Sequence, residues 1–83
     1  MKTISYSKDA LKVLKRMPRP DAQRIRRKIT DYAEDPAAQR NNVKVLVGSD
    51  YIRLRVANWR VIMDDRGTVL LVLMVGVRGD VYR

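Results

Sequence analysis

The sequence has no cysteine and no histidine among its 83 residues. Without cysteine it can form no disulfide and supplies no thiol nucleophile, a pattern that fits a reducing, cytoplasmic setting. Without histidine it also lacks the commonest general base and metal ligand. No glycine-rich phosphate-binding loop is recognisable either. We therefore expect a protein that uses neither a metal nor another cofactor.

Long hydrophobic runs are also missing. The longest apolar run, Val69 to Val77, has nine residues if Gly76 is counted. A membrane-spanning helix needs about 20. The polar N-terminus, MKTISYSKDALK, does not resemble a signal peptide. We expect a soluble chain with no membrane partner, folded as a single domain over residues 1–83.

What the chain has in excess is positive charge. It carries 18 Lys and Arg against nine Asp and Glu, a formal net charge of +9. The excess is present in both halves of the chain, so the positive charge is spread over the whole domain and is not confined to one tail. Such a field attracts polyanions with little regard for sequence. The composition favours a nucleic-acid or acidic-protein partner over a basic surface that only aids solubility.

The first half of the chain predicts a strand followed by two helices. The strand covers residues 2–6, and Ser7 is the expected N-cap of a helix that ends at Pro18. Pro20 suits the first turn of the second helix, which should stop before Pro36. The short connection between the helices predicts an antiparallel helical hairpin.

After Asn41 and Asn42 the hydrophobic period changes from 3.6 to 2. Alternating or apolar segments predict strands at 43–47, 51–56, 59–64 and 68–77. The last is apolar on both faces, as a central strand should be. Asp64 and Asp65, which precede Gly67, are interpreted as a hairpin turn and not as a metal site. We expect an α+β fold of order β-α-α-β-β-β, with an N-terminal helical hairpin packed on one face of a mainly antiparallel sheet.

The strand at 51–56 carries arginines on one face. Side chains alternate at period 2, so Tyr51, Arg53 and Arg55 lie opposite an apolar face that can pack on a core. The two guanidiniums are then about 7 Å apart, and Arg60 follows after the Ala57-Asn58 turn. Such a face suits a phosphate backbone or an acidic peptide. By composition alone, alternating arginines on an exposed strand more often form a solvated face than a catalytic site.

One reaction needs no more than these residue types. In RNA cleavage by the substrate's own 2′-hydroxyl, the enzyme aligns the attack and stabilises the charge added to the phosphorus. Arginine suits the second task because it stays charged and binds phosphate oxygens in a fork, but it is a poor general acid or base. Tyrosine can exchange a proton where positive charges favour its phenolate.

Three segments, in this order, carry a resemblance to a known family: KITDYAEDP at Lys28–Pro36, VKVLVGSDYIRLRVANWRVIMDD at Val43–Asp65 and VGVRGDVYR at Val75–Arg83. Together with the N-terminal strand and helix, they resemble the RelE/ParE toxins of toxin–antitoxin modules. The likeness is greatest to the RelE branch, the ribosome-dependent mRNA interferases. It implies the toxin of a type II module, a metal-independent mRNA endonuclease that uses 2′-hydroxyl attack on the scissile phosphate and so inhibits translation.

The resemblance also implies roles and partners. Arg60 matches the arginine that stabilises the transition-state phosphate, Arg78 one assigned to phosphate or leaving-group stabilisation, and Tyr82 the tyrosine that stacks on or activates the scissile nucleotide. We assign RNA binding to Lys44, Arg53, Arg55 and Arg83. The implied partners are a RelB-like cognate antitoxin, the ribosome and mRNA. The toxin is expected to be a monomer when free and a hetero-oligomer with its antitoxin.

Three departures from the family pattern weaken the nuclease prediction. The usual C-terminal histidine is Val77 here, the second arginine of the ending is Gly79, and the tyrosine that closes the middle block is Met63. Loss of one general acid or base typically costs about 10²–10⁴-fold in rate. Two alternatives therefore stay open: a ParE-like inhibitor of DNA gyrase without nuclease activity, and a weakened toxin that acts mainly as an antitoxin-binding corepressor.

Overall fold

The structure is a computed structural model that describes residues 1–77; residues 78–83 lie outside the described part. In chain order the elements are β1 (Thr3–Tyr6), α1 (Lys8–Arg16), α2 (Arg19–Glu34), the 3₁₀ helix η1 (Pro36–Asn42), β2 (Val43–Val45), β3 (Tyr51–Val56), β4 (Trp59–Asp65) and β5 (Val69–Val77). The predicted α+β class is confirmed. Four strands follow the helices, one at each of the four predicted segments, although the predicted order counted only three.

The helices begin and end where the sequence signals place them. The Ser7 side chain caps α1 by accepting a hydrogen bond from the Ala10 backbone N–H at 3.0 Å. Pro20 lies in the first turn of α2, and α2 ends just before Pro36. The 3₁₀ helix η1 was not predicted. Asp35 caps it, accepting a hydrogen bond from the backbone N–H of the residue three positions on.

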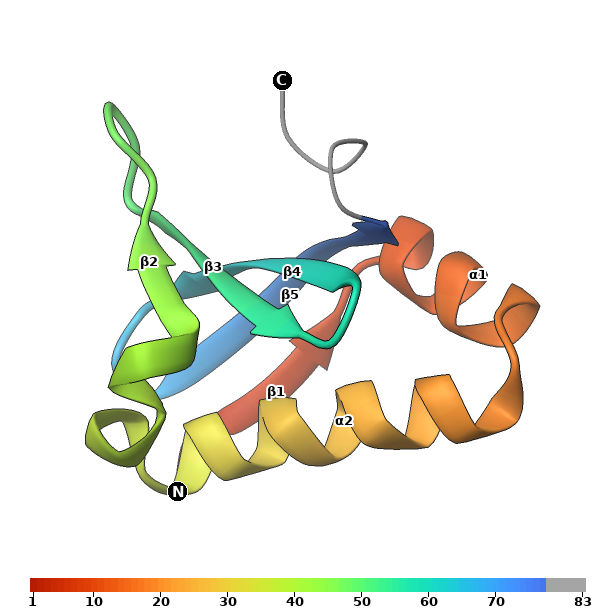
Figure 1. Cartoon of the computed structure of the whole chain (residues 1–83). Helices are drawn as coiled ribbons and strands as arrows, with labels where there is room; N and C mark the ends of the chain where they lie inside the picture. Colours follow the sequence, from red (N-terminus) through yellow and green to blue (C-terminus); the bar gives the residue numbers. More distant parts are fainter. Residues whose placement is uncertain (78–83) are drawn as a thin grey trace.

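The described strands form one sheet in the order β1-β5-β4-β3-β2 (Figure 1). Neighbours are antiparallel except β1 and β5, which run parallel. The apolar strand β5 lies between β1 and β4, so the prediction that it is a central strand is confirmed. α1 packs beside β5, and α2 contacts β1 and β3.

One face of the sheet carries the main core. Ile52, Leu54 and Val56 of β3 are buried there and pack in the same cluster as Ile25 and Ile29 of α2. The cluster also includes residues of α1, β4 and β5: Ala10, Leu14, Val61, Met63, Leu70, Val72 and Val75. Alternation along β3 therefore leaves its arginines on the opposite face, which the helices do not cover.

The uncovered face has a smaller apolar cluster of its own. Leu46 follows β2 and is buried against Ile62 of β4, with Leu73 of β5 packed beside them. The predicted alternation through position 47 is wrong, because β2 ends at Val45 and Val47 is 97% exposed. The chain turns there, with the next residue, a glycine, at φ 80°. The loop between β2 and β3 projects beyond the rest of the sheet (Figure 1).

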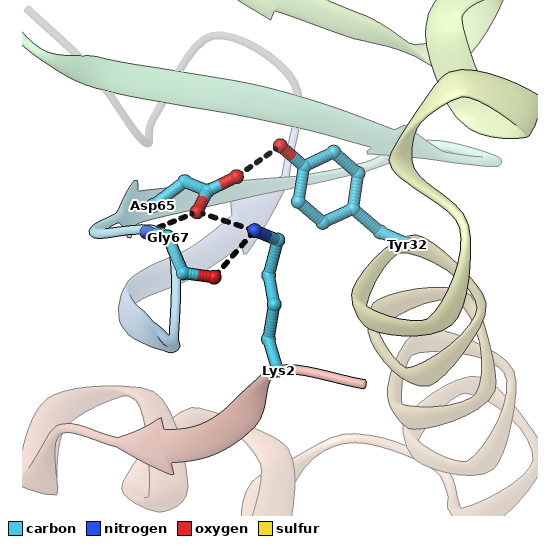
Figure 2. Close-up of polar contacts among 4 residues, drawn as sticks. All are labelled: Lys2, Tyr32, Asp65 and Gly67. Atoms are coloured by element: carbon cyan, nitrogen blue, oxygen red, sulfur yellow. Dashed lines mark hydrogen bonds and ion pairs between the residues drawn. The ribbon is translucent and has the colours of Figure 1, made fainter.

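A polar cluster joins the β4–β5 turn to the N-terminus and to α2 (Figure 2). Asp65 accepts hydrogen bonds from the Tyr32 hydroxyl at 2.7 Å and from the Gly67 backbone N–H at 2.9 Å, and pairs with Lys2 Nζ at 3.0 Å. Lys2 also donates to the Gly67 carbonyl at 2.7 Å. Gly67 has a φ of 86°, which glycine adopts without steric cost. The two aspartates are the last residues of β4, and Asp65 holds the hairpin turn that follows them.

This cluster shifts two pKa values. Burial acts to raise the pKa of Asp65, but hydrogen bonds from Tyr32 and from its other donors outweigh burial, so the pKa lies below its usual value. The pKa of Tyr32 is raised, first by burial and then by its hydrogen bond to the carboxylate. Tyr32 is therefore a fixed hydrogen-bond donor. Across residues 1–77, no helix has the length and hydrophobicity required to cross a membrane.

Candidate functional site

Four basic residues lie together on the sheet face that the helices leave uncovered. Arg55 of β3 is directly opposite Arg60 of β4, and Lys44 of β2 is directly opposite Arg53 of β3. Directly opposed residues of antiparallel strands point to the same face. Arg53 and Arg55 are two residues apart, so their Cα atoms are roughly 7 Å apart along the strand. We call Lys44, Arg53, Arg55 and Arg60 the basic quartet.

The buried face of the same strands holds the quartet in place. Leu54 and Val61 are fully buried and are themselves a cross-strand pair, one position in from Arg55 and Arg60. A slip of one residue would expose these apolar side chains and bury the arginines, so the register is strongly specified. The connecting turn contains Ala57 at φ 53°, an uncommon conformation for a residue other than glycine.

Small and apolar residues continue the rows of the quartet across the sheet. Gly76 of β5 is opposite Arg60 and places no side chain beside it. Ile62 lies between Arg53 and Met74, and Met74 is 44% exposed. The quartet therefore borders an apolar strip whose exposed side chain is Met74, since Ile62 is itself buried. This arrangement suits a ligand that combines anionic groups with flat apolar ones, as a nucleic-acid strand does.

The charges of three quartet members are not neutralised within the described residues. The ion pairs found there join Lys2 to Asp65 and Arg66 to Asp64, and neither involves Lys44, Arg53 or Arg55. Like charges placed directly across a sheet are destabilising. A surface that keeps several cations close together without carboxylates is suited to an external anion.

The tyrosines within residues 1–77 divide between the two faces of the sheet. Tyr6 and Tyr32 belong with the main core, and burial raises the pKa of both. Neither is suited to lose a proton at the uncovered face. Tyr51 lies on the same face as Arg53 and is 38% exposed. In residues 1–77 it is the tyrosine available to a ligand on the basic quartet.

The structure thus brings together four of the seven predicted site residues. Arg78, Tyr82 and Arg83 lie outside the described residues. Sequence reasoning missed a hollow of about 210 Å³ at the sheet edge, which Asn41 and Asn42 line together with quartet members. The sequence did contain a sign of this hollow, since the two asparagine amides come directly before the strand that carries Lys44. Within residues 1–77 no group of three or more Asp and Glu is placed to hold a metal ion.

Comparison with known proteins agrees with this geometry. The family model described as "ParE toxin of type II toxin-antitoxin system, parDE" matches residues 4–82. A search of curated proteins found no match. Several solved structures have the same fold at low sequence identity.

In the archaeal RelE–RelB complex from Pyrococcus horikoshii OT3, the matched chain is 22% identical with a TM-score of 0.78, covering 95% of this chain and 97% of that one. In the toxin–antitoxin complex RelBE2 from Mycobacterium tuberculosis, it is 20% identical with a TM-score of 0.76, covering 93% and 98%. The isolated RelE toxin from E. coli is 18% identical with a TM-score of 0.75, covering 93% and 84%. With the family model matched over nearly the whole chain and a RelE-like fold, this protein belongs to the RelE/ParE family of type II toxin–antitoxin toxins.

Proposed function

We propose that this toxin is a ribosome-dependent endoribonuclease that cuts mRNA without a metal ion. The observation that carries the proposal is the basic quartet, which gathers Lys44, Arg53, Arg55 and Arg60 on one uncovered sheet face. A single-stranded RNA backbone is the polyanion that fits such a row, and the neighbouring apolar strip suits its bases. The ribosome would present the mRNA in an extended conformation and so supply much of the alignment.

The reaction is a transfer within the RNA itself. The 2′-hydroxyl oxygen forms a bond to the adjacent phosphorus, and the bond from phosphorus to the 5′-oxygen of the next nucleotide breaks. The products are a 2′,3′-cyclic phosphate and a 5′-hydroxyl, with one proton leaving the nucleophile and one reaching the leaving oxygen. Arg55 and Arg60, facing each other across two strands, are suited to stabilise the extra negative charge on the phosphorane.

Proton transfer is the weaker part of the proposed chemistry. The chain has no histidine, and the arginines hardly deprotonate. Tyr6 and Tyr32 face the core with raised pKa values. By resemblance, Tyr82 would activate or stack on the scissile nucleotide, and Arg78 would stabilise the phosphate or the leaving group. We expect turnover below that of a relative with a histidine, by about 10²–10⁴-fold.

We also propose a RelB-like antitoxin as the cognate partner. The matched structures include complexes of that kind, among them the RelE–RelB complex and RelBE2. A net charge of +9 favours an acidic partner segment. The free toxin would be a monomer in the cytoplasm, and the complex a hetero-oligomer in which the antitoxin blocks access to the basic quartet.

The direct test is to map mRNA 5′ ends after induction of the toxin in cells. The parent should create new 5′ ends within translated regions, and Arg60→Ala should lower their yield by about 10²–10³-fold. Arg27→Ala is the matched control, since Arg27 is an exposed arginine on α2. New 5′ ends of equal yield in parent and Arg60→Ala would contradict the assignment of the site.

A ParE-like inhibitor of DNA gyrase is the second candidate. The description of the matched family model favours it, and so does Val77 at the position of the usual histidine. Purified toxin would then inhibit supercoiling of plasmid DNA by gyrase and leave mRNA on translating ribosomes intact. A third possibility, a corepressor with no toxic activity, requires that induction cause no growth arrest.

A further inference from the structure

A concave site lies at the edge of the sheet, where η1 leads into β2. It is a hollow of about 210 Å³ lined by Asn41, Asn42, Val43, Lys44, Arg53 and Arg55. Pockets for complete small-molecule ligands are typically about 300–1,000 Å³. The size of this hollow suits one flat group, such as a single nucleobase.

Its cationic side is shared with the basic quartet. Lys44 and Arg53 are cross-strand partners, and Arg55 also faces Arg60 on the next strand. No ion pair within the described part of the chain involves Lys44, Arg53 or Arg55. Because Arg55 both lines the hollow and faces Arg60, a phosphate held by these two arginines would place its nucleotide at the mouth of the hollow. Arginine planes also stack on bases, so Arg53 and Arg55 suit both parts of a nucleotide.

The opposite side of the hollow is made of side-chain amides. The register that pairs Val43 with Leu54 brings Asn42 alongside Arg55. Asn42 donates one amide N–H to Gln39 Oε1 at 3.4 Å, which orients its amide group. One further N–H and the carbonyl oxygen of Asn42 remain for a ligand, and no hydrogen bond within residues 1–77 engages the side chain of the exposed Asn41.

We propose that this hollow receives the base of the nucleotide next to the scissile phosphate and selects it through Asn42. A carbonyl oxygen beside an N–H matches the amino donor and ring-nitrogen acceptor of adenine, the base that asparagine most often reads in this way. Bases of single-stranded RNA are exposed for such recognition along their edges. The inference rests on the proposed function, because it takes the strand bound on the quartet to be RNA.

The test is equilibrium binding of four short 2′-O-methyl RNA oligonucleotides that differ in one central base. The methyl group removes the attacking hydroxyl, so binding is measured without cleavage. At low ionic strength the wild-type protein should bind the adenine probe about tenfold more tightly than the uracil probe. Asn42→Ala should abolish most of this difference. Gln23→Ala, which removes an exposed amide on α2, should retain it.

Two further variants separate selection from general affinity. Arg53→Ala should weaken binding of all four probes by a similar factor, because phosphate contacts and stacking on an arginine plane do not distinguish the bases. Gln39→Ala should reduce selectivity less than Asn42→Ala does, since it only frees the amide that Gln39 orients. Gln39→Ala keeps every lining residue of the hollow, so it still tests the role of the Asn42 amide in selectivity if Asn42→Ala folds poorly.

The inference is overturned if wild-type protein binds the four probes equally, or if Asn42→Ala keeps the full preference. Failure of the proposed function would be seen elsewhere, in the mapping of mRNA 5′ ends. A protein that distinguishes bases through Asn42 but produces no new 5′ ends would contradict the nuclease and support the base-reading hollow. A protein that cuts mRNA but shows no preference among the probes would contradict the hollow alone.

Discussion

Arg55 and Arg60 face each other directly across the antiparallel pair of β3 and β4. Two like charges in this position are destabilising unless an anion lies close to them. The pair lies on the sheet face that the helices leave uncovered, where Lys44 and Arg53 form the neighbouring basic pair. An anion between Arg55 and Arg60 would turn the repulsion into attraction.

The first prediction concerns the salt dependence of RNA binding. Replacing Arg55 by glutamine removes one phosphate contact, so affinity for a single-stranded oligonucleotide should fall and the slope of log K against log salt should become shallower by about 0.7. Titrations at several salt concentrations measure both effects. Arg27→Gln, on the helical side, is the control and should change neither. An unchanged slope for Arg55→Gln would place the RNA on another surface.

The second prediction concerns the hydrogen bond from Tyr32 to Asp65. Tyr32→Phe keeps the ring in the core but removes the hydroxyl that donates to the carboxylate at 2.7 Å. Because the acceptor is charged, the loss should lower the free energy of unfolding by about 1.5–3 kcal/mol, as measured by urea denaturation. Tyr51→Phe, on the exposed face, is the control and should have little effect.

The raised pKa of Tyr32 also predicts how the stability of the protein changes in alkali. Its pKa is raised in the folded state above the usual 10.0, so its contribution is complete below pH 10.0 and is lost as the pH rises beyond it. Tyr32→Phe should therefore flatten the loss of stability in that range. Equal alkaline slopes for wild type and Tyr32→Phe would contradict the assignment.

The third prediction concerns acid. The pKa of Asp65 lies below its usual 3.8 in the folded protein. Its contribution to stability is therefore complete above about pH 5 and is lost as the pH falls through the folded pKa. Asp65→Asn should lower stability at neutral pH and reduce its dependence on pH in acid. Asp50→Asn, in the exposed loop before β3, should leave the acid limb of the curve close to that of wild type.

The fourth prediction concerns the turn that sets Arg55 opposite Arg60. Ala57 has a φ of 53°, a conformation that costs an L-residue roughly 1–2 kcal/mol. Ala57→Gly relieves this cost but makes the unfolded chain more flexible, for a net gain of roughly 0.5–1 kcal/mol. Ala57→Pro fixes φ near −65° and should destabilise the protein by more than about 1 kcal/mol. Thermal unfolding of the two variants tests the sign: a gain for proline would show that the turn tolerates negative φ.

Much of the fold could be predicted from local signals. Ser7 and Pro18 mark the ends of the first helix, and Pro36 follows the end of the second, because capping and proline geometry act over a few residues. The 3₁₀ helix η1 was missed because PAAQRNN has no hydrophobic periodicity. The course of the chain at positions 45–47 was also missed, since Leu46 is buried by a contact with Ile62, a residue far along the sequence.

The candidate site, like the fold, could be predicted from the sequence only in part. Alternation in YIRLRV was enough to put Arg53 and Arg55 on one face, because successive side chains of any strand point in opposite directions. Which residues lie beside them depended on register and strand order, which arise from packing of the whole sheet against the helices. Only the folded chain sets Arg55 against Arg60, joins Lys44 to Arg53, and closes a hollow between them and the amides of η1. A local pattern is fixed by backbone geometry, whereas neighbours from distant segments are chosen by the burial of a common core.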